Sequence, residues 1–281
     1  MKLSSLQLEA FSAVARERHF SRAAESLGLA QSALSTRILN LEDDLGTRLF
    51  IRDRAGVSLT DAAQRLLVHC QSIDALEREL LVPGSAAIRI GGYSSIVRSL
   101  VQPALSKTFG PKKRRNIELS LITRELEELP ELFRRGEVDY LFLDRELSGS
   151  AWESTLLGEE EYVLVRSAKE SDPESWFLDH DERDETTLRF LKLNRMTVSS
   201  LRRRYFDDIY GILDGIKQGW GNAIVPRHLL KDETGLQIVS ELKPLRVPVY
   251  LHYRRLPVYP SHHEAILSLA QLIRLSLSRN Q

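Results

Sequence analysis

Between residues 20 and 41, apolar residues recur at the spacing of two short helices separated by Gly28. Ser21 is expected to cap the first helix through its hydroxyl, and Gly28 to end it in the left-handed conformation. A second helix begins near Gln31. The pattern predicts a helix-turn-helix, whose second helix presents polar side chains to the DNA major groove. The inward positions are Ala23, Ala24 and Leu27 in the first helix and Leu34, Ile38 and Leu41 in the second.

Apolar periodicity continues on both sides of this pair of helices. An earlier helix is expected over residues 8–15, and residues 51–60 predict a short β-hairpin that turns near Gly56. A hairpin after a helix-turn-helix is a wing. Thr60 then caps a long helix over residues 61–81, in which apolar residues alternate at spacings of three and four.

That heptad-like seam predicts helix pairing between two subunits. The alternative is a helix that lies on the core of its own domain. If the helix pairs, the dimerisation contacts are expected at Leu66, Ile73, Leu76 and Leu80.

A change of pattern follows Pro83-Gly84-Ser85, which marks a domain boundary. Strands are expected at residues 86–90, 117–122 and 138–143, with helices between them. Strand–helix–strand–helix–strand predicts an open parallel sheet with right-handed crossovers. Ligands of such sheets bind at the carboxyl ends of the strands.

The composition fits a globular protein of two or three domains. The chain has 281 residues, 42% of them hydrophobic and 28% charged. It has no run of eighteen apolar residues and no apolar signal segment, so neither a membrane span nor export is expected. Cys70 is the only cysteine, which excludes an intrachain disulfide and fits a reducing cytoplasm.

Net charge gives no support to DNA binding, because Lys plus Arg and Asp plus Glu both number 39. DNA affinity must therefore come from where individual side chains point. Glutamine pairs with adenine and arginine with guanine, while hydroxyls reach bases or phosphates. The alternative is an ordinary solvated helix face. The expected groove contacts are Gln31, Ser32, Ser35, Thr36 and Arg37, and the expected phosphate contacts are Ser21, Arg22 and the wing residues Arg52 and Arg54.

The acids near the end of the second helix form a cluster, Glu42, Asp43 and Asp44. This position leaves the N-terminal half of the helix free to meet phosphate.

This order of elements resembles the LysR-type transcriptional regulators. The N-terminal match is specific, and Thr60 fits the threonine that opens the family's linker helix. Two positions depart from the family pattern: Ala30 replaces a Ser or Thr helix cap, and Ser32 replaces a frequent proline. The resemblance is strong over residues 1–81 and topological from residue 86 onward. The matching segments are residues 20–24, 31–35, Ile38, 41–42, 45–46 and 49–50.

The resemblance implies an α+β multidomain fold. It has a winged helix-turn-helix at residues 1–60, a linker or dimerisation helix at 61–82 and an α/β effector-binding domain at 86–281. That domain would resemble a periplasmic binding protein, with two subdomains joined by crossing strands near residues 144–152 and 247–253. Subdomain I would comprise residues 86–146 and 252–281, closed by a helix at 261–277, and subdomain II residues 147–251.

Effector ligands are expected where strands end. Ser94 and Ser95 follow a strand and begin a helix, so their hydroxyls and free N–H groups suit a carboxylate, although plain helix capping explains them equally. Thr123 and Arg124 end the next strand and suit an anion. Asp144 and Asp208, with Asp207 beside it, suit an ammonium group. Both signs together indicate a carboxylate or an amino-acid-like effector.

Catalytic patterns are absent from the sequence: it contains no CxxC, HExxH, GxSxG or P-loop motif. His262 and His263 are adjacent and poorly spaced for one metal. We interpret Glu159-Glu160-Glu161 as a solvated run and residues 178–189 as an acidic surface loop. The expectation is therefore no enzyme, no cofactor and no metal.

The function that these patterns favour is sequence-specific regulation of transcription in response to a small-molecule effector. The expected partners are double-stranded promoter DNA, the effector, and further copies of the chain in a homodimer or homotetramer, with RNA polymerase as an additional candidate and no membrane. The alternative is a cytoplasmic α/β ligand-binding or enzymatic protein whose N-terminal helices serve only oligomerisation.

Overall fold

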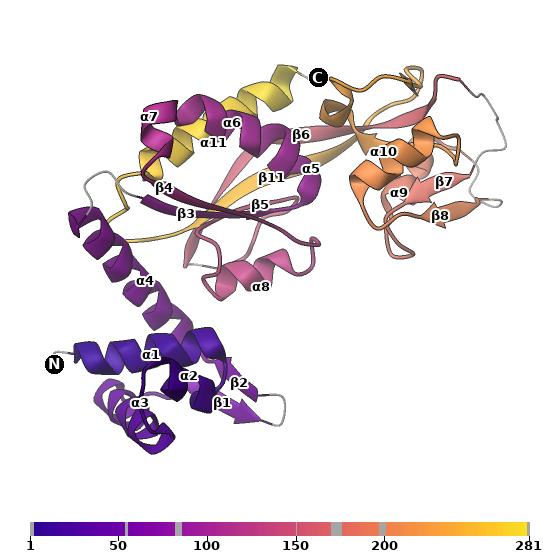
Figure 1. Ribbon diagram of the computed structural model, residues 1–281. Helices are drawn as coiled ribbons and strands as arrows, with labels where there is room; N and C mark the ends of the chain where they lie inside the picture. The colour runs from indigo at the N-terminus through magenta and orange to yellow at the C-terminus, as the bar shows by residue number, and fades with distance from the viewer. Residues whose placement is uncertain are drawn as a thin grey trace. The chain divides into compact units, whose positions relative to one another are not determined.

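The computed structural model describes residues 3–53, 56–81, 86–149, 151–169, 176–196 and 201–279. The chain forms two compact units, one built chiefly from residues up to Ala87 and one from most of the remainder (Figure 1). Arg54 and the expected boundary at Pro83-Gly84-Ser85 lie outside the described residues. Within the described part, no helix has the length and apolar character needed to cross a membrane.

The N-terminal unit is the predicted helix-turn-helix with a wing. Leu34 and Leu41 are fully buried and Ile38 is 3% exposed, so the apolar positions read from the sequence form the core. Phe50 and Leu59 begin and end the antiparallel hairpin and face one another. The elements are α1 (Ser5–Glu17), α2 (Phe20–Ser26), α3 (Gln31–Leu45), β1 (Phe50–Asp53), β2 (Gly56–Leu59) and α4 (Asp61–Leu81).

Helix ends follow the prediction at two positions and differ at one. Gly28 has φ +65°, and α3 starts at Ala30 without a side-chain cap, both as expected. Ser21 does not cap α2. The helix begins one residue earlier, and His19 is its cap, with Nδ1 accepting a hydrogen bond from the Ser21 N–H at 3.2 Å.

The long helix α4 divides its apolar residues between two environments. Thr60 caps it, accepting from the Ala63 N–H at 3.2 Å. Leu66 packs on the core of the N-terminal unit, as the own-domain alternative expects. Farther along, Leu76 is 57% and Leu80 73% exposed, which leaves the end of the seam open.

The C-terminal unit is organised by a seven-stranded sheet, in which β9 pairs with β6 beside the main path β10-β6-β11-β5-β3-β4. Strands β3 and β5 are parallel, as predicted, but β11 joins β5 antiparallel, so the sheet is mixed. Its strands are β3 (Ala86–Gly92), β4 (Ile117–Thr123), β5 (Tyr140–Leu143), β6 (Trp152–Ser167), β9 (Ala223–Pro226), β10 (Leu236–Ile238) and β11 (Leu245–Arg254).

The two halves of this unit share β6 and β11. These strands pair antiparallel from Trp152 opposite Arg254 to Tyr162 opposite Leu245, with an irregularity between Val249 and Tyr250. The first crossing strand therefore lies later than residues 144–152, where we had placed it. The acidic residues within β6 break the apolar pattern that would otherwise mark a single long strand.

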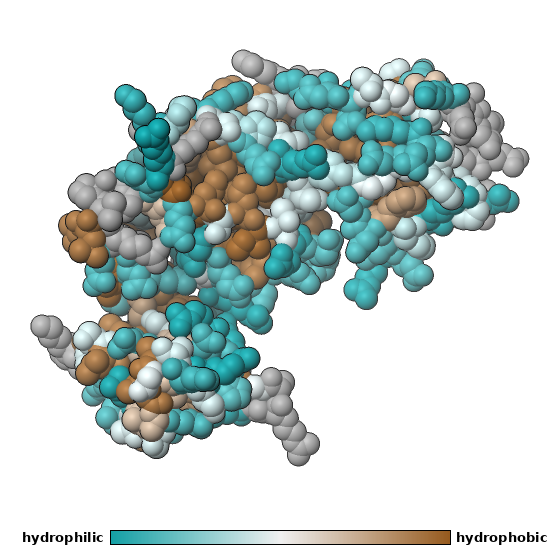
Figure 2. Space-filling view, in the orientation of Figure 1, coloured by the Kyte–Doolittle hydropathy of each residue, from teal (hydrophilic) through white to brown (hydrophobic). Residues whose placement is uncertain are grey.

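We call the part with β3, β4, β5 and α11 the first half, and the part built on the end of β6 the second half. Helices α6 and α11 lie together on one face of the first half, which confirms that the closing helix packs there (Figure 1). Figure 2 shows hydrophobic residues gathered over the sheet where the edge strand β4 lies, and Leu119 on β4 is 43% exposed. The first half also holds α5 (Ser94–Ile96), the π-helical turn η1 (Val97–Val101), α6 (Gln102–Thr108), α7 (Pro111–Arg114), α8 (Leu129–Arg134) and α11 (His263–Arg279).

The second half wraps helices around short strands. Its core contains Val163 and Val165 of β6 with Ile212 and Ile216 of α10. The elements are β7 (Phe177–Asp179), α9 (Thr186–Leu193), β8 (Arg203–Tyr205), α10 (Ile209–Lys217), the 3-10 helix η2 (Arg227–Leu230), and the strands β9 and β10.

One buried histidine makes the stability of the C-terminal unit depend on pH. His252 on β11 has no exposed surface, and its Nε2 donates to the Arg145 carbonyl at 3.0 Å while Nδ1 lies 2.8 Å from Ser154 Oγ. Burial lowers the pKa of His252 from 6.5 to about 4, although the Arg145 carbonyl opposes this.

We expect this histidine to weaken the fold in mild acid. The depressed pKa means that the stabilisation is complete above pH 6.5 and is lost as the pH falls towards 4, by up to about 3 kcal/mol. Urea unfolding at several pH values measures it, and fluorescence isolates the C-terminal unit because Trp152, Trp176 and Trp220 are the only tryptophans. His252→Gln should reduce the loss of unfolding free energy as the pH falls from 6.5 towards 4. The matched change His69→Gln, at an exposed histidine, should not. Equal slopes for wild type and His252→Gln would contradict the assignment.

Candidate functional site

The outer face of α3 carries the predicted groove contacts. Gln31, Ser32 and Thr36 are exposed, while Ser35 and Arg37 are half-buried at its margin. The structure therefore brings these five side chains onto one polar face above the buried Leu34, Ile38 and Leu41. Thr36 Oγ1 donates to the Ser32 carbonyl at 3.0 Å, which fixes its hydroxyl.

A hydrogen bond joins the two helices of the motif at this face. Ser21 Oγ on α2 donates to Gln31 Oε1 on α3 at 2.8 Å. The contact holds the Gln31 amide in one orientation, with its NH₂ group directed elsewhere. Ser21, predicted as a phosphate contact, thus also positions a predicted base contact.

The predicted phosphate-binding arginines are already held in place. Arg22 donates to the Glu17 carbonyl at 2.8 Å, and the Arg52 guanidinium stacks 3.6 Å from the centroid of the Phe20 ring. Both remain exposed. Among the described residues, Arg37 has no hydrogen-bond or ion-pair partner, so its guanidinium is available.

Glu42, in the last turn of α3, is buried, with only 7% of it exposed. Its carboxylate accepts from the backbone N–H groups of Leu49 at 2.7 Å and Phe50 at 3.3 Å, and it pairs with Arg48 at 2.7 Å. This anchor fastens the last turn of α3 to the start of the wing. Its neighbours Asp43 and Asp44 are exposed.

In the C-terminal unit, the ends of β3 and β5 lie at one edge because these strands are parallel. Ser94 and Ser95 follow β3, and Ser95 is 5% exposed. Asp144 follows β5 and pairs with Arg145 at 2.9 Å. Burial raises the pKa of Asp144, while Arg145 opposes this.

Two predicted effector ligands have local partners. Asp208 caps α10, its Oδ2 accepting from the Gly211 N–H at 2.9 Å. Arg124 donates to the Thr123 carbonyl at 2.8 Å and lies 4.0 Å from Glu128. Arg124 is therefore turned towards its own segment.

The run Glu159–Glu161 is wrong as a solvated surface, because Glu160 is 1% and Glu161 6% exposed. Glu160 Oε2 accepts from the Tyr93 hydroxyl at 2.9 Å, and Oε1 lies 2.5 Å from His228 Nε2. His228 Nδ1 lies 2.7 Å from Ser99 Oγ. Burial, followed by the charge of Glu160, raises the pKa of Tyr93. Sequence reasoning missed Tyr93, Ser99 and His228, since no local pattern links them.

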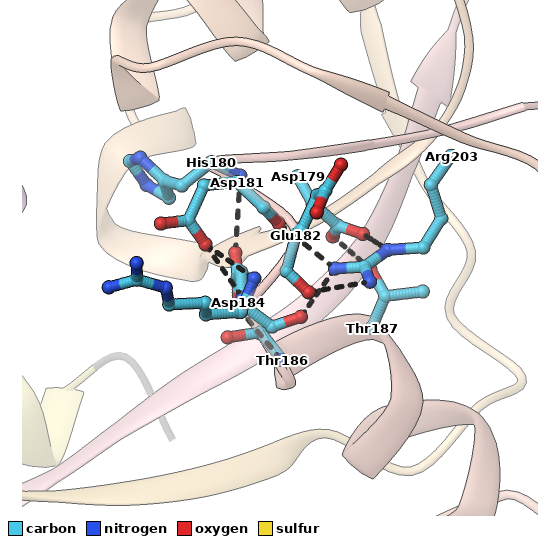
Figure 3. Close-up of polar contacts among 9 residues, drawn as sticks. Asp179, His180, Asp181, Glu182, Asp184, Thr186, Thr187 and Arg203 are labelled. Carbon is cyan, nitrogen blue, oxygen red and sulfur yellow. Dashed lines mark hydrogen bonds and ion pairs between the residues drawn. The ribbon is translucent and has the colours of Figure 1, made fainter.

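Residues 178–189 comprise the end of β7, a turn that is exposed at residues 181–183 and the start of α9, so only the middle of the segment is the surface loop that we expected. Asp179 is 2% exposed and Thr187 fully buried. Figure 3 shows the Arg203 guanidinium directed at the Asp179 carboxylate and at nearby carbonyl oxygens. Those oxygens belong to Asp181, Glu182 and Asp184, at 3.2, 3.3 and 2.5 Å. In the described ranges no group of three or more His, Cys, Asp or Glu residues has the arrangement of a metal site.

The carboxylate of Glu125, just after β4, is exposed, as is that of Asp207, whose charge acts on it. Burial raises the pKa of Glu125; His180 opposes this, and Asp207, Glu127 and Asp181 add to it. Glu125 belongs to the first half and Asp207 to the second. Neither carboxylate has an ion-pair or hydrogen-bond partner in the described part of the chain.

A separate polar cavity of about 570 Å³ lies at the start of β6. Its walls are residues 146–149, 152–154 and Arg255. It contains none of the predicted effector ligands, so it does not mark their site.

Comparison with known families assigns both units. Residues 6–64 match the bacterial regulatory helix-turn-helix proteins of the lysR family, and residues 83–271 match the LysR substrate binding domain. The chain belongs to the LysR family. It is a LysR-type DNA-binding transcriptional regulator with an effector-binding domain, which confirms the predicted resemblance and fold class.

Curated LysR relatives match at moderate identity. The regulator ShiR of Corynebacterium glutamicum is 36% identical over 166 residues, and the match spans about half, 56%, of each protein. The regulator HdfR of Yersinia enterocolitica is 26% identical over 271 residues, covering 86% of this chain and 88% of HdfR.

Solved LysR structures share the fold over nearly the whole chain. ArgP of Mycobacterium tuberculosis superposes with a TM-score of 0.76 at 20% identity, covering 99% of this chain and 98% of ArgP. LysG of Corynebacterium glutamicum, with arginine bound as effector, gives 0.72 at 18% identity, with coverages of 96% and 98%.

The Glu42 anchor of this LysR head can be tested directly. Glu42→Ala removes the acceptor of the Leu49 and Phe50 amides, so those amides should exchange with solvent deuterium about tenfold faster or more. Hydrogen–deuterium exchange of peptides covering residues 45–53 measures this, with Asp43→Ala as an exposed control. Unchanged protection in Glu42→Ala would show that the wing does not depend on this carboxylate.

Proposed function

We propose that α3 reads the major groove of double-stranded promoter DNA, with α2 and the wing on the phosphates. The observation that supports this most is the polar face of α3, where Ser21 orients Gln31 and Arg37 has a free guanidinium. Gln31 suits adenine and Arg37 suits guanine. The uncapped first turn of α3 also offers N–H groups to a phosphate.

The regulator would act as a homodimer or homotetramer in the cytoplasm, where its DNA is. Exposed Leu76 and Leu80 on α4 give a pairing surface for two linker helices. Leu119 on the open edge strand β4 supplies a second apolar surface for assembly. Each head would then read one half-site of a two-fold operator. RNA polymerase is the further partner that such a regulator would meet at a promoter.

We also propose that the chain is not an enzyme and uses no cofactor. Its curated relatives are transcriptional regulators. We further propose the domain limits predicted from the sequence: a DNA-binding head at residues 1–60, a linker helix at 61–82 and an effector-binding domain at 86–281.

The effector of this protein, we propose, carries a cationic group. The charge of Asp207, in the second half, adds to the raised pKa of Glu125, in the first half, which burial raises and His180 opposes. Among the described residues neither carboxylate has a hydrogen-bond or ion-pair partner. The nearby arginines are already used: Arg124 lies on its own strand end and Arg145 on Asp144. A cation placed between the halves would therefore be attracted by both carboxylates.

The sequence predicts a carboxylate or an amino-acid-like effector. A cationic group restricts that choice to effectors that also carry a positive charge. An amino group or guanidinium would face Glu125, Asp144 and Asp207, while the hydroxyl and N–H groups at Ser94 remain for a carboxylate. A basic amino acid has both groups. The fold neighbour LysG holds arginine as its effector, which agrees with this chemistry.

DNA reading is tested by a gel shift with the DNA upstream of the protein's own gene. Arg37→Ala and Gln31→Ala should each weaken binding about ten- to hundredfold, because a base contact contributes about 1–3 kcal/mol. Arg16→Ala is the matched control, since Arg16 is exposed and paired with Glu17. If the double variant Gln31→Ala/Arg37→Ala bound as well as wild type, α3 would not be the reading helix.

The effector class is tested by thermal unfolding of the full chain with arginine, lysine, glutamate or norleucine. A ligand at about one hundred times its Kd stabilises by about 2.7 kcal/mol, or about 5–10 °C for a domain of this size. We expect the shift with the basic amino acids only, and its loss in Glu125→Gln/Asp207→Asn. Asp232→Asn, an exposed acid elsewhere in the second half, should keep it. A shift with glutamate alone would reverse the assigned charge.

A further inference from the structure

Buried polar contacts join the two halves of the effector domain. Ser99, on η1 of the first half, lies 2.7 Å from Nδ1 of His228, on η2 of the second half. The other ring nitrogen of His228 lies 2.5 Å from Glu160, which also accepts from the hydroxyl of Tyr93 at 2.9 Å. The chain of contacts thus runs from the first half to His228 of the second half and returns to Tyr93 of the first half through Glu160 on the shared strand β6.

The centre of this chain of contacts, between Glu160 and His228, is shielded from water, whereas Tyr93 and Ser99 at its ends are half-buried. Glu160 is 1% and His228 9% exposed. Polar groups that are buried without partners are costly, and hydrogen bonds to a carboxylate in a low-dielectric interior are among the stronger ones. Pulling the halves apart would separate Ser99 from His228 and Tyr93 from Glu160, so closure is favoured by the protein's own side chains.

A second contact lies beside this chain. The guanidinium of Arg98, next to Ser99 on η1, stacks 3.9 Å from the ring centroid of Tyr210 on α10. Cation–π contacts of this kind are attractive and lose their strength when the ring and the cation separate. Arg98 and Tyr210 again come from opposite halves, so one turn of the first half carries both contacts.

Other partners of the same groups lie within one half. Tyr162, two residues beyond Glu160 on β6, reaches it at 3.4 Å, and Ser99 donates to the Ser95 carbonyl within its own helical turn. These bonds would survive opening of the domain. The contacts that favour closure are therefore Tyr93 with Glu160 and Ser99 with His228, together with Arg98 on Tyr210.

We infer that Tyr93, Ser99, Glu160 and His228 form a latch that keeps the two halves together in the absence of effector. The closed arrangement is then the resting state, and an effector acts on a domain that is already assembled. The inference rests on the proposed function only in taking the junction of the halves as the place where effector binds. A closed form that is already populated strengthens effector binding, because apparent affinity scales with the competent fraction.

The latch is tested by the distance between the halves in the full chain, without DNA or effector. Nitroxide labels on Lys107→Cys in α6 and Lys192→Cys in α9, in a Cys70→Ser background, report it by pulsed electron paramagnetic resonance. The labelled chain is mixed with an excess of unlabelled Cys70→Ser chain, so that the distance measured is the one within a single subunit. Both lysines are exposed. Wild type should give one narrow distance distribution, whereas Ser99→Ala and Tyr93→Phe should each raise the open population about tenfold.

Tyr162→Phe is the matched control. It removes a hydroxyl from the same carboxylate, but one that lies on the same strand as Glu160, so the distance should not change. Tryptophan fluorescence checks that each variant folds, and Ser99→Ala is the mild change because it only shortens a helical side chain. A single narrow distance in both Ser99→Ala and Tyr93→Phe overturns the latch, as does equal opening in Tyr162→Phe.

The result is separable from the proposed function. If this measurement shows no latch, the proposals on DNA reading and on the effector's charge are unaffected, because the gel shift and thermal unfolding test them separately. Conversely, a chain that opened as expected in Ser99→Ala but ignored every basic ligand would keep the latch and remove the cationic effector.

Discussion

The pairing of β6 with β11 constrains the whole effector domain. Each strand is hydrogen-bonded to the other from Trp152 and Arg254 to Tyr162 and Leu245, and each also pairs with strands of one half or the other. Unpairing them would expose many backbone groups, so the halves can rotate or bend about these strands but not separate. The side chains that join the two halves can therefore move only a short distance apart when the halves rotate.

The alternation of side chains along β6 explains why the adjacent residues Glu160 and Glu161 have different partners. Successive side chains of a strand point to opposite faces. Glu160 consequently meets Tyr93 and His228, whereas Glu161 pairs with Arg227 at 3.0 Å and Arg246 at 3.3 Å. One residue binds across the halves and its neighbour strengthens the second half. Both carboxylates are tolerated when buried because each one has hydrogen-bond or ion-pair partners.

In both units the positions of individual charged residues, and not the net charge, determine what each surface can bind. In the head, Arg52 is held on Phe20 and Glu42 fastens the wing, so the polar face of α3 stands on a rigid support. In the effector domain, Arg124 and Arg145 contact groups of their own segments, while in the described part of the chain Glu125 and Asp207 have no hydrogen-bond or ion-pair partner. A protein with no net charge can thus present a face suited to DNA and a junction suited to a cation.

The sequence by itself determined the features that depend on neighbours a few residues away. The apolar spacing of Leu34, Ile38 and Leu41, the left-handed Gly28 and the Thr60 cap are local, because a helix repeats every 3.6 residues and a cap acts within one turn. The family motif added the order of the units.

Only the tertiary structure decided which charged residues are buried. Glu160 resembles a solvated residue in any short window, since its partners Tyr93 and His228 lie 67 and 68 residues away along the chain. Glu42 resembles one for the same reason, as the amides that it binds belong to the following strand. A carboxylate is buried when donors converge on it in space, and the sheet that brings Tyr93 and His228 together is built from strands far apart in sequence.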